Sequence, residues 1–127
     1  MTTKKTVPAA YLQNNVMTAS PVKLVKLLYE GALRHMEVAR IELSSKETSS
    51  SAKAGESLGR SLAILGELRA SLDMQAGAAI STDLDRLYEF AIHSISEANI
   101  HRDPKPLESS IKVVRTLKSA WDELAGA

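Results

Sequence analysis

The chain has 127 residues, with 16 lysines and arginines against 15 aspartates and glutamates, a net charge of +1 and no cysteine. This length fits one domain that buries roughly two-thirds of the surface exposed by its unfolded chain. The lack of cysteine excludes disulfides, thiolate catalysis and cysteine-ligated zinc, and the scattered basic residues argue against a nucleic-acid partner.

Residues 1–16 have mixed polarity and contain Pro8, which predicts a flexible arm with at most a short helical turn. Its apolar residues favour either a displaceable lid over an apolar groove or a disordered terminus: Val7, Tyr11, Leu12 and Val16. Polar residues interrupt the apolar core that a signal peptide needs, and no stretch approaches the ~20 apolar residues of a membrane span. We therefore expect a cytoplasmic protein that does not insert into a membrane.

The rest of the chain, residues 17–127, is rich in helix-forming residues, and its apolar positions recur at spacings of three and four. Ser20 and Pro21 suit a helix cap and a first helical residue, as do Asp103 and Pro104 later in the chain. The expected helices cover about residues 21–43, 52–72, 80–100 and 104–124. Four helices of this length with short connections predict an all-α fold, an antiparallel four-helix bundle.

Each expected helix carries an apolar stripe that should face the core. In the second helix it is Leu58, Leu62, Leu65, Leu68 and Leu72. In the third it is Ile80, Leu84, Leu87, Tyr88, Ala91, Ile95 and Ala98, which leaves Phe90 on another side. In the fourth it is Leu107, Ile111, Val114, Leu117 and Trp121.

Two helices carry more apolar or small surface than one core face requires. The first has a second apolar line: Leu27, Gly31, Val38 and Ile41. That line fits a central helix touching two neighbours in the bundle, and it equally fits a contact with a partner.

The second helix aligns small residues on one side: Gly55, Gly59, Ala63, Gly66 and Ala70. Each interior glycine costs about 1 kcal/mol relative to alanine, so their alignment calls for a reason. This side is either solvated, packed tightly on a neighbouring helix, or a groove for a partner helix that Ile64 would flank.

No catalytic or metal-binding pattern emerges. A di-iron bundle needs a glutamate three residues before each ligating histidine, and no histidine here has one. There is also no phosphate-binding loop, so we expect no cofactor, no metal and no enzyme activity. Glu30 and Arg34 have the spacing of an attractive helical ion pair.

Several motifs carry a family resemblance: the run from Met17 to Ala32, Leu72–Asp73, Gly77, Ile80, Leu84, Leu87–Phe90, Glu97–Asn99 and Ala120–Trp121. In order and spacing they resemble the flagellin-specific flagellar export chaperone family. The chain departs from the family pattern at residues 76–79, between the second and third helices.

The resemblance implies a cytoplasmic chaperone that binds the C-terminal polymerising segment of flagellin, prevents premature polymerisation and delivers it to the flagellar type III export gate. Tyr11 matches the tyrosine through which the family contacts the export-gate membrane protein, and Val7 is a looser match. A flagellar regulator or co-chaperone is a further candidate partner. The residues alone leave open a helical adaptor or secretion chaperone for another client.

The apolar and small surfaces together supply the predicted client-binding residues: Leu27, Gly31, Val38, Ile41, Gly55, Gly59, Ala63, Ile64, Gly66, Ala70 and Phe90.

Overall fold

The computed structural model describes residues 21–72 and 78–126. These residues form four helices and no strand: α2 (Pro21–Ser44), α3 (Ser50–Ala70), α4 (Ala78–His101) and α5 (Lys105–Gly126). Every predicted helix is confirmed, with its ends displaced by two residues at most. The predicted arm and the Ser20 cap lie outside the described residues.

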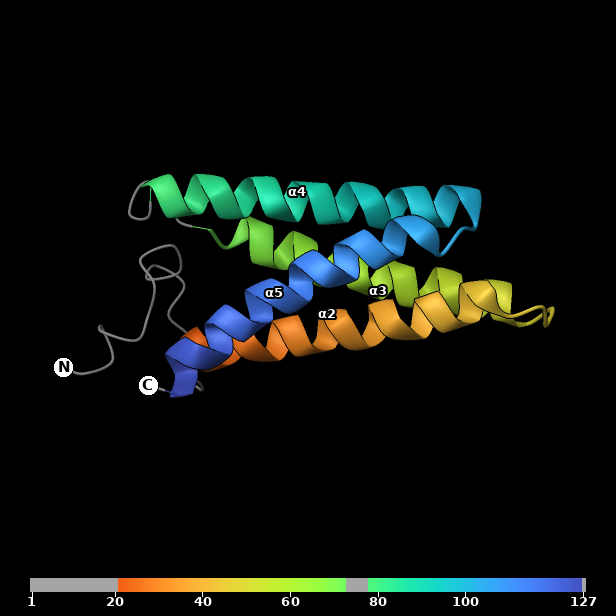
Figure 1. Ribbon diagram of the computed structural model, residues 1–127, viewed down its shortest axis with the longest axis horizontal. Helices are drawn as coiled ribbons and strands as arrows, with labels where there is room; N and C mark the ends of the chain where they lie inside the picture. The colour runs from red at the N-terminus through yellow and green to blue at the C-terminus, as the bar shows by residue number, and fades with distance from the viewer. Residues whose placement is uncertain (1–20, 73–77, 127) are drawn as a thin grey trace.

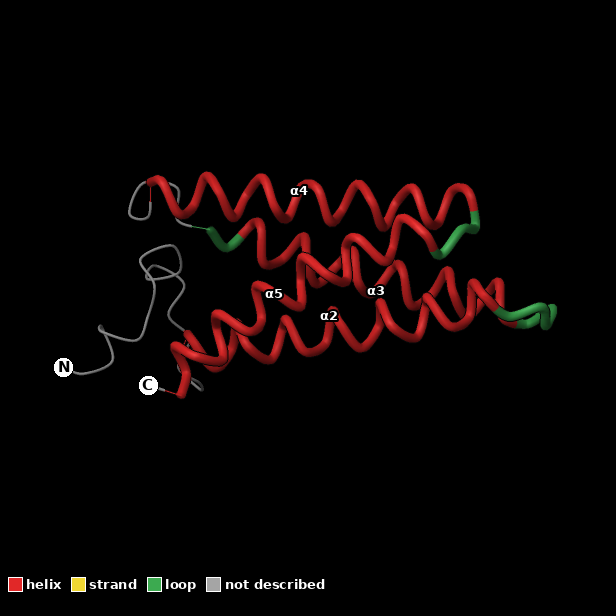
Figure 2. Tube along the Cα trace, in the orientation of Figure 1, coloured by secondary structure: helices red, strands yellow, loops and turns green. Residues whose placement is uncertain are grey.

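Successive helices run antiparallel, and each packs on two neighbours in the cyclic order α2, α3, α4, α5 (Figures 1 and 2). α2 begins at the end of the bundle where α5 ends, and α4 begins at that same end (Figure 1). The predicted antiparallel four-helix bundle is therefore confirmed.

The connection from α4 to α5 is made by local backbone chemistry. Arg102 adopts a left-handed conformation with φ of 51°, and the backbone N–H of Asp103 donates to the carbonyl of Ala98 at 3.1 Å. This is the arrangement of a Schellman C-cap, which satisfies a carbonyl at the helix end. The Asp103 carboxylate then accepts the backbone N–H of Lys105 at 3.0 Å, as expected of a capping aspartate.

The centre of the core is aromatic. Tyr29 of α2 and Tyr88 of α4 are fully buried and share a hydrogen bond between their hydroxyls across the bundle. The Trp121 ring, 4% exposed, lies 6.2 Å from the Tyr29 ring, so the prediction that Trp121 faces inward is confirmed. Burial raises the pKa of Tyr29 to about 12, which keeps this phenol neutral at physiological pH.

The predicted core stripe of α4 is wrong at two positions. Ile80 is 60% exposed and Leu87 is 37% exposed, whereas Ser81, fully buried, and Ser94, 8% exposed, turn inward. A small serine lets two helix backbones approach closely when its hydroxyl has a hydrogen-bond partner. A pattern based on apolar residues therefore fails to predict that these two serines are buried.

Candidate functional site

Charged residues join the second half of α5 to α2. Lys26 Nζ lies 3.7 Å from Asp122, Lys118 Nζ lies 3.9 Å from Glu30, and Arg115 donates a hydrogen bond to Glu37. The Lys118 ammonium, hydrogen-bonded to Asp122, lowers the pKa of that carboxyl. Burial opposes ionisation of Glu37, but hydrogen bonds and charge from Arg40 and Arg115 outweigh it and lower the pKa. These ion pairs hold the second half of α5 against α2.

The first half of α5 is held against α4 instead. The Ser110 hydroxyl donates to the carbonyl of Ala91 at 3.3 Å, and both residues are fully buried. Because serine and alanine are small, the two backbones can approach here. α5 therefore crosses the bundle diagonally, beginning close to α4 and ending on α2 (Figure 1).

An apolar groove lies between α4 and α5. It has a volume of about 260 Å³ and is lined by Leu87, Lys112, Val113, Thr116 and Leu117, mostly through apolar atoms. We call it the α4/α5 groove. Its exposed apolar atoms make it a candidate binding surface.

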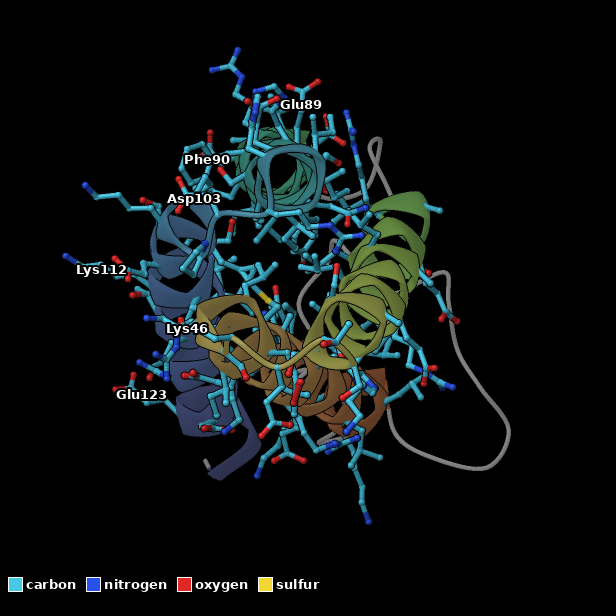
Figure 3. All side chains as sticks on the ribbon, turned by 90° about the vertical axis from the view of Figure 1, so that its right-hand side faces the viewer. Lys46, Glu89, Phe90, Asp103, Lys112 and Glu123 are labelled. Carbon is cyan, nitrogen blue, oxygen red and sulfur yellow. The ribbon has the colours of Figure 1, made fainter. Side chains whose placement is uncertain are left out.

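Two further apolar residues extend this surface along α4. Ile80 lies two helical turns before Leu87, on the same side of the helix. Phe90, 45% exposed, lies on the flank of the bundle from which Lys112 of α5 projects (Figure 3). The prediction that Phe90 lies off the core stripe is confirmed.

The second apolar line predicted on α2 divides into exposed and buried parts. Leu27, Val38 and Ile41 are exposed, at 51%, 42% and 58%. Gly31 is buried against α3, where a Cβ at this position would lie 3.3 Å from the Cδ1 atom of Ile64. Three of the four predicted residues are thus exposed to solvent, and the fourth packs within the bundle against Ile64.

The predicted pairing of Glu30 with Arg34 is wrong. The Glu30 carboxylate instead lies 3.9 Å from Lys118 of α5. That contact bridges two helices, whereas the expected one would have remained within α2.

The small-residue side of α3 faces solvent over most of its length. Nothing lies within 4 Å of the Cβ positions at Gly59 and Gly66, and Ala63 and Ala70 are exposed. Gly55 differs, because the Arg102 guanidinium lies 3.6 Å from its Cβ position and fills the space. Tight packing on a neighbouring helix is therefore wrong at Gly59 and Gly66, and a docked partner stays a prediction.

Residues 21–72 and 78–126 contain no cluster of three histidine, cysteine or acidic side chains suited to a metal ion. No helix among them is long and apolar enough to cross a bilayer. The predicted lid and export-gate residues fall outside the described part of the chain: Val7, Tyr11, Leu12 and Val16.

Sequence reasoning missed the lining of the α4/α5 groove. It assigned Leu87 and Leu117 to the core and left Val113 outside the stripe of the fourth helix; Leu117 does pack against the core but also lines the groove. No sequence signal distinguishes them from core residues, because their exposure depends on how far α5 diverges from α4.

The fold and its surfaces define a class: a small helical bundle that exposes apolar surface for another polypeptide. A family model described as "Flagellar protein FliS" matches residues 4–127. The chain therefore belongs to the FliS family, and the resemblance seen in its motifs is confirmed.

Curated relatives are consistent with this assignment. The flagellar secretion chaperone FliS of Vibrio cholerae is 34% identical over 113 residues, covering 89% of this chain and 81% of the relative. The flagellar secretion chaperone FliSB of Pseudomonas aeruginosa is 32% identical over 114 residues, covering 90% and 88%. FliS of Salmonella typhimurium, with the same description, is 30% identical over 115 residues, covering 90% and 83%.

Proposed function

We propose that this protein is a flagellar secretion chaperone that holds the C-terminal polymerising segment of flagellin in the α4/α5 groove. Family membership and the relatives' shared description support the chaperone role. The groove itself carries the structural part of the proposal, because it is an apolar depression that lies open to solvent between two of the described helices. The work of the protein is binding, with no catalytic step.

The mechanism follows from the chemistry of the groove. An amphipathic segment that lays its apolar face on Leu87, Val113 and Leu117 removes that face from water, at a gain of about 25 cal/mol per Å². The same face then cannot pair with other subunits, so filament assembly is blocked. Ordering the segment opposes binding, so contacts along Ile80 and Phe90 are needed to extend the interface.

Delivery to the export gate requires a second contact. In this proposal the arm before Pro21 makes it, with Tyr11 and Val7 touching the cytoplasmic domain of the export-gate membrane protein. α2, which follows the arm in the sequence, begins at the end of the bundle where α5 terminates (Figure 1). The arm can therefore also cover apolar surface as a lid until the client arrives, in the cytoplasm, and a regulator or co-chaperone can compete for the same surface.

The test is titration calorimetry with the C-terminal segment of flagellin from the same organism. One-to-one binding with a negative heat-capacity change and a gain of helix is expected. Leu87→Asp should weaken binding about tenfold or more, because a carboxylate would be desolvated in the groove. Leu27→Asp compares the groove with the α2 surface that the sequence predicted to bind the client: Leu27 is 51% exposed on α2, and unchanged affinity is expected if the groove holds the client, whereas weaker binding would support the predicted α2 contact.

Ile80→Asp is a second test in case Leu87→Asp does not fold. Ile80 is 60% exposed and contributes little to the core, so this variant should fold. Unchanged binding by folded variants at positions 80 and 87 would contradict the groove assignment. Failure of the unmodified protein to bind flagellin would instead favour an adaptor or secretion chaperone for a different client.

A further inference from the structure

The outward side of α2 has the spacing of a coiled-coil seam. Leu27, Gly31, Arg34, Val38 and Ile41 follow one another at intervals of four, three, four and three residues. In a coiled coil this alternation keeps one stripe of a helix against a partner helix over successive heptads. We call these five positions the α2 seam.

The seam is exposed yet continuous. Leu27, Val38 and Ile41 are between 42% and 58% exposed, although they are large apolar residues. At Gly31, where a side chain is missing, the Ile64 methyl group of α3 lies 3.3 Å from the Cβ position and occupies the space. An approaching helix would therefore meet apolar surface along the line, interrupted by one charge.

That charge is Arg34. Among the other charged residues of α2, Glu30 forms an ion pair with Lys118 of α5 and Glu37 forms one with Arg40. Among the described residues the Arg34 guanidinium has neither an ion pair nor a hydrogen-bond acceptor, and its Nη2 atom lies 3.9 Å from the Cβ position of Gly31. Burial first, and then the charges of Arg34 and Arg60, lower the pKa of neighbouring His35 against the opposing charge of Glu56.

The position of Arg34 argues against a second copy of the chain as the occupant. It lies seven residues from Leu27 and seven from Ile41, at the midpoint of the seam. Antiparallel pairing of two α2 seams about a twofold axis would therefore set the two Arg34 side chains against each other. Facing like charges oppose such pairing, whereas an acidic residue on a different helix would satisfy the same position.

We propose that the α2 seam binds an amphipathic helix of a second partner protein, with an Asp or Glu opposite Arg34 and apolar residues opposite Leu27 and Ile41. This goes beyond the proposed flagellin-binding function. At Gly31 the seam borders Ile64 of α3, whereas the groove is lined by residues of α4 and α5, and α3 and α5 lie on opposite sides of the bundle (Figure 3). The seam and the α4/α5 groove can therefore be occupied at the same time.

The test uses the full-length chain and a pair of monomeric synthetic helices that have leucine at the seam positions. One carries glutamate at the central seam position and the other carries lysine. Fluorescence anisotropy should show that the glutamate helix binds about tenfold more tightly than the lysine helix. Arg34→Glu should reverse that order, and because Arg34 is exposed the variant should fold normally.

Two further measurements locate the site and establish its independence. Hydrogen exchange should show protection of α2 on binding of the glutamate helix, and a saturating amount of the flagellin segment should leave its affinity unchanged. An unaltered preference in the Arg34→Glu variant, or displacement of the helix by the flagellin segment, would overturn the proposal. So would the absence of binding to either helix.

The charge argument also predicts a change in self-association. Arg34→Leu makes the α2 seam apolar throughout, so sedimentation equilibrium should reveal a concentration-dependent dimer. Arg34→Gln, which lacks both the charge and the added apolar surface, is the matched control and should dimerise less. A monomeric Arg34→Leu variant would contradict the role assigned to the arginine.

Discussion

The hydrogen bond between Tyr29 and Tyr88 predicts a measurable coupling in the core. Both side chains are fully buried, and the Tyr29 hydroxyl also interacts with the Trp121 side chain. Phenylalanine at either position keeps the ring and removes only the hydroxyl. Substitution therefore isolates the polar contact from the packing.

Each single substitution should destabilise the folded state. Tyr29→Phe removes the oxygen that both Tyr88 and Trp121 use, and the loss of a buried partner costs about 1–3 kcal/mol. Tyr88→Phe leaves Trp121 available to the Tyr29 hydroxyl but removes every contact of the Tyr88 hydroxyl, so its cost should be at least that of one net hydrogen bond, about 1 kcal/mol. In the double variant the shared bond is lost only once, so its total cost should be about 1 kcal/mol less than the sum.

Urea unfolding of the four proteins, followed by circular dichroism and by fluorescence of the single tryptophan, provides these free energies. The slope of the unfolding free energy against urea should be the same in all four. Strict additivity of the two single costs would refute the reasoning, because it would mean that the hydroxyls do not stabilise each other.

Three other predictions concern the ion pairs of α5, the glycines of the bundle and the N-terminal arm. Folding lowers the pKa of Glu37 and of Asp122, so their ion pairs stabilise the folded state above about pH 4. This stabilisation should be lost as the pH falls through the pKa values of the folded state. Urea midpoints measured across the acid range should therefore fall, and they should fall less in Glu37→Gln. Gly59→Ala should raise the free energy of unfolding by about 0.5–1 kcal/mol, because the added Cβ meets nothing within 4 Å. Gly31→Ala should be less stabilising or destabilising, because its Cβ would lie 3.3 Å from Ile64. A destabilised Gly59→Ala variant would contradict the solvent-exposed position of Gly59. Deletion of residues 1–16 should raise the association rate for the flagellin segment or promote self-association, and stopped-flow kinetics with sedimentation would exclude a lid if neither changed.

The local elements could be predicted from the sequence because their causes are local. A helix shows its period within a few turns, which is why all four helices agree with the prediction to within two residues. Asp103 acts as a cap through its own carboxylate, and Phe90 lies off the stripe of α4 that packs inward. Family membership was also evident from the spacing of motifs and is confirmed by the family match.

The binding surfaces depend on the distances between helices, which the sequence pattern does not report. Ile80 and Leu87 belong to an apolar stripe by periodicity, yet both are exposed. The contact of Ser110 with Ala91 draws the start of α5 onto α4, while the ion pair of Lys118 with Glu30 helps to hold its second half on α2.

The sequence by itself thus determined the helices, their order and most of the residues that are able to be buried. Only the tertiary structure decided which of these residues the neighbouring helix actually covers. The physical reason is that periodicity describes the position of a side chain around its own helix axis. Exposure depends instead on the approach of a second axis, and small side chains and ion pairs far apart in the sequence determine that approach.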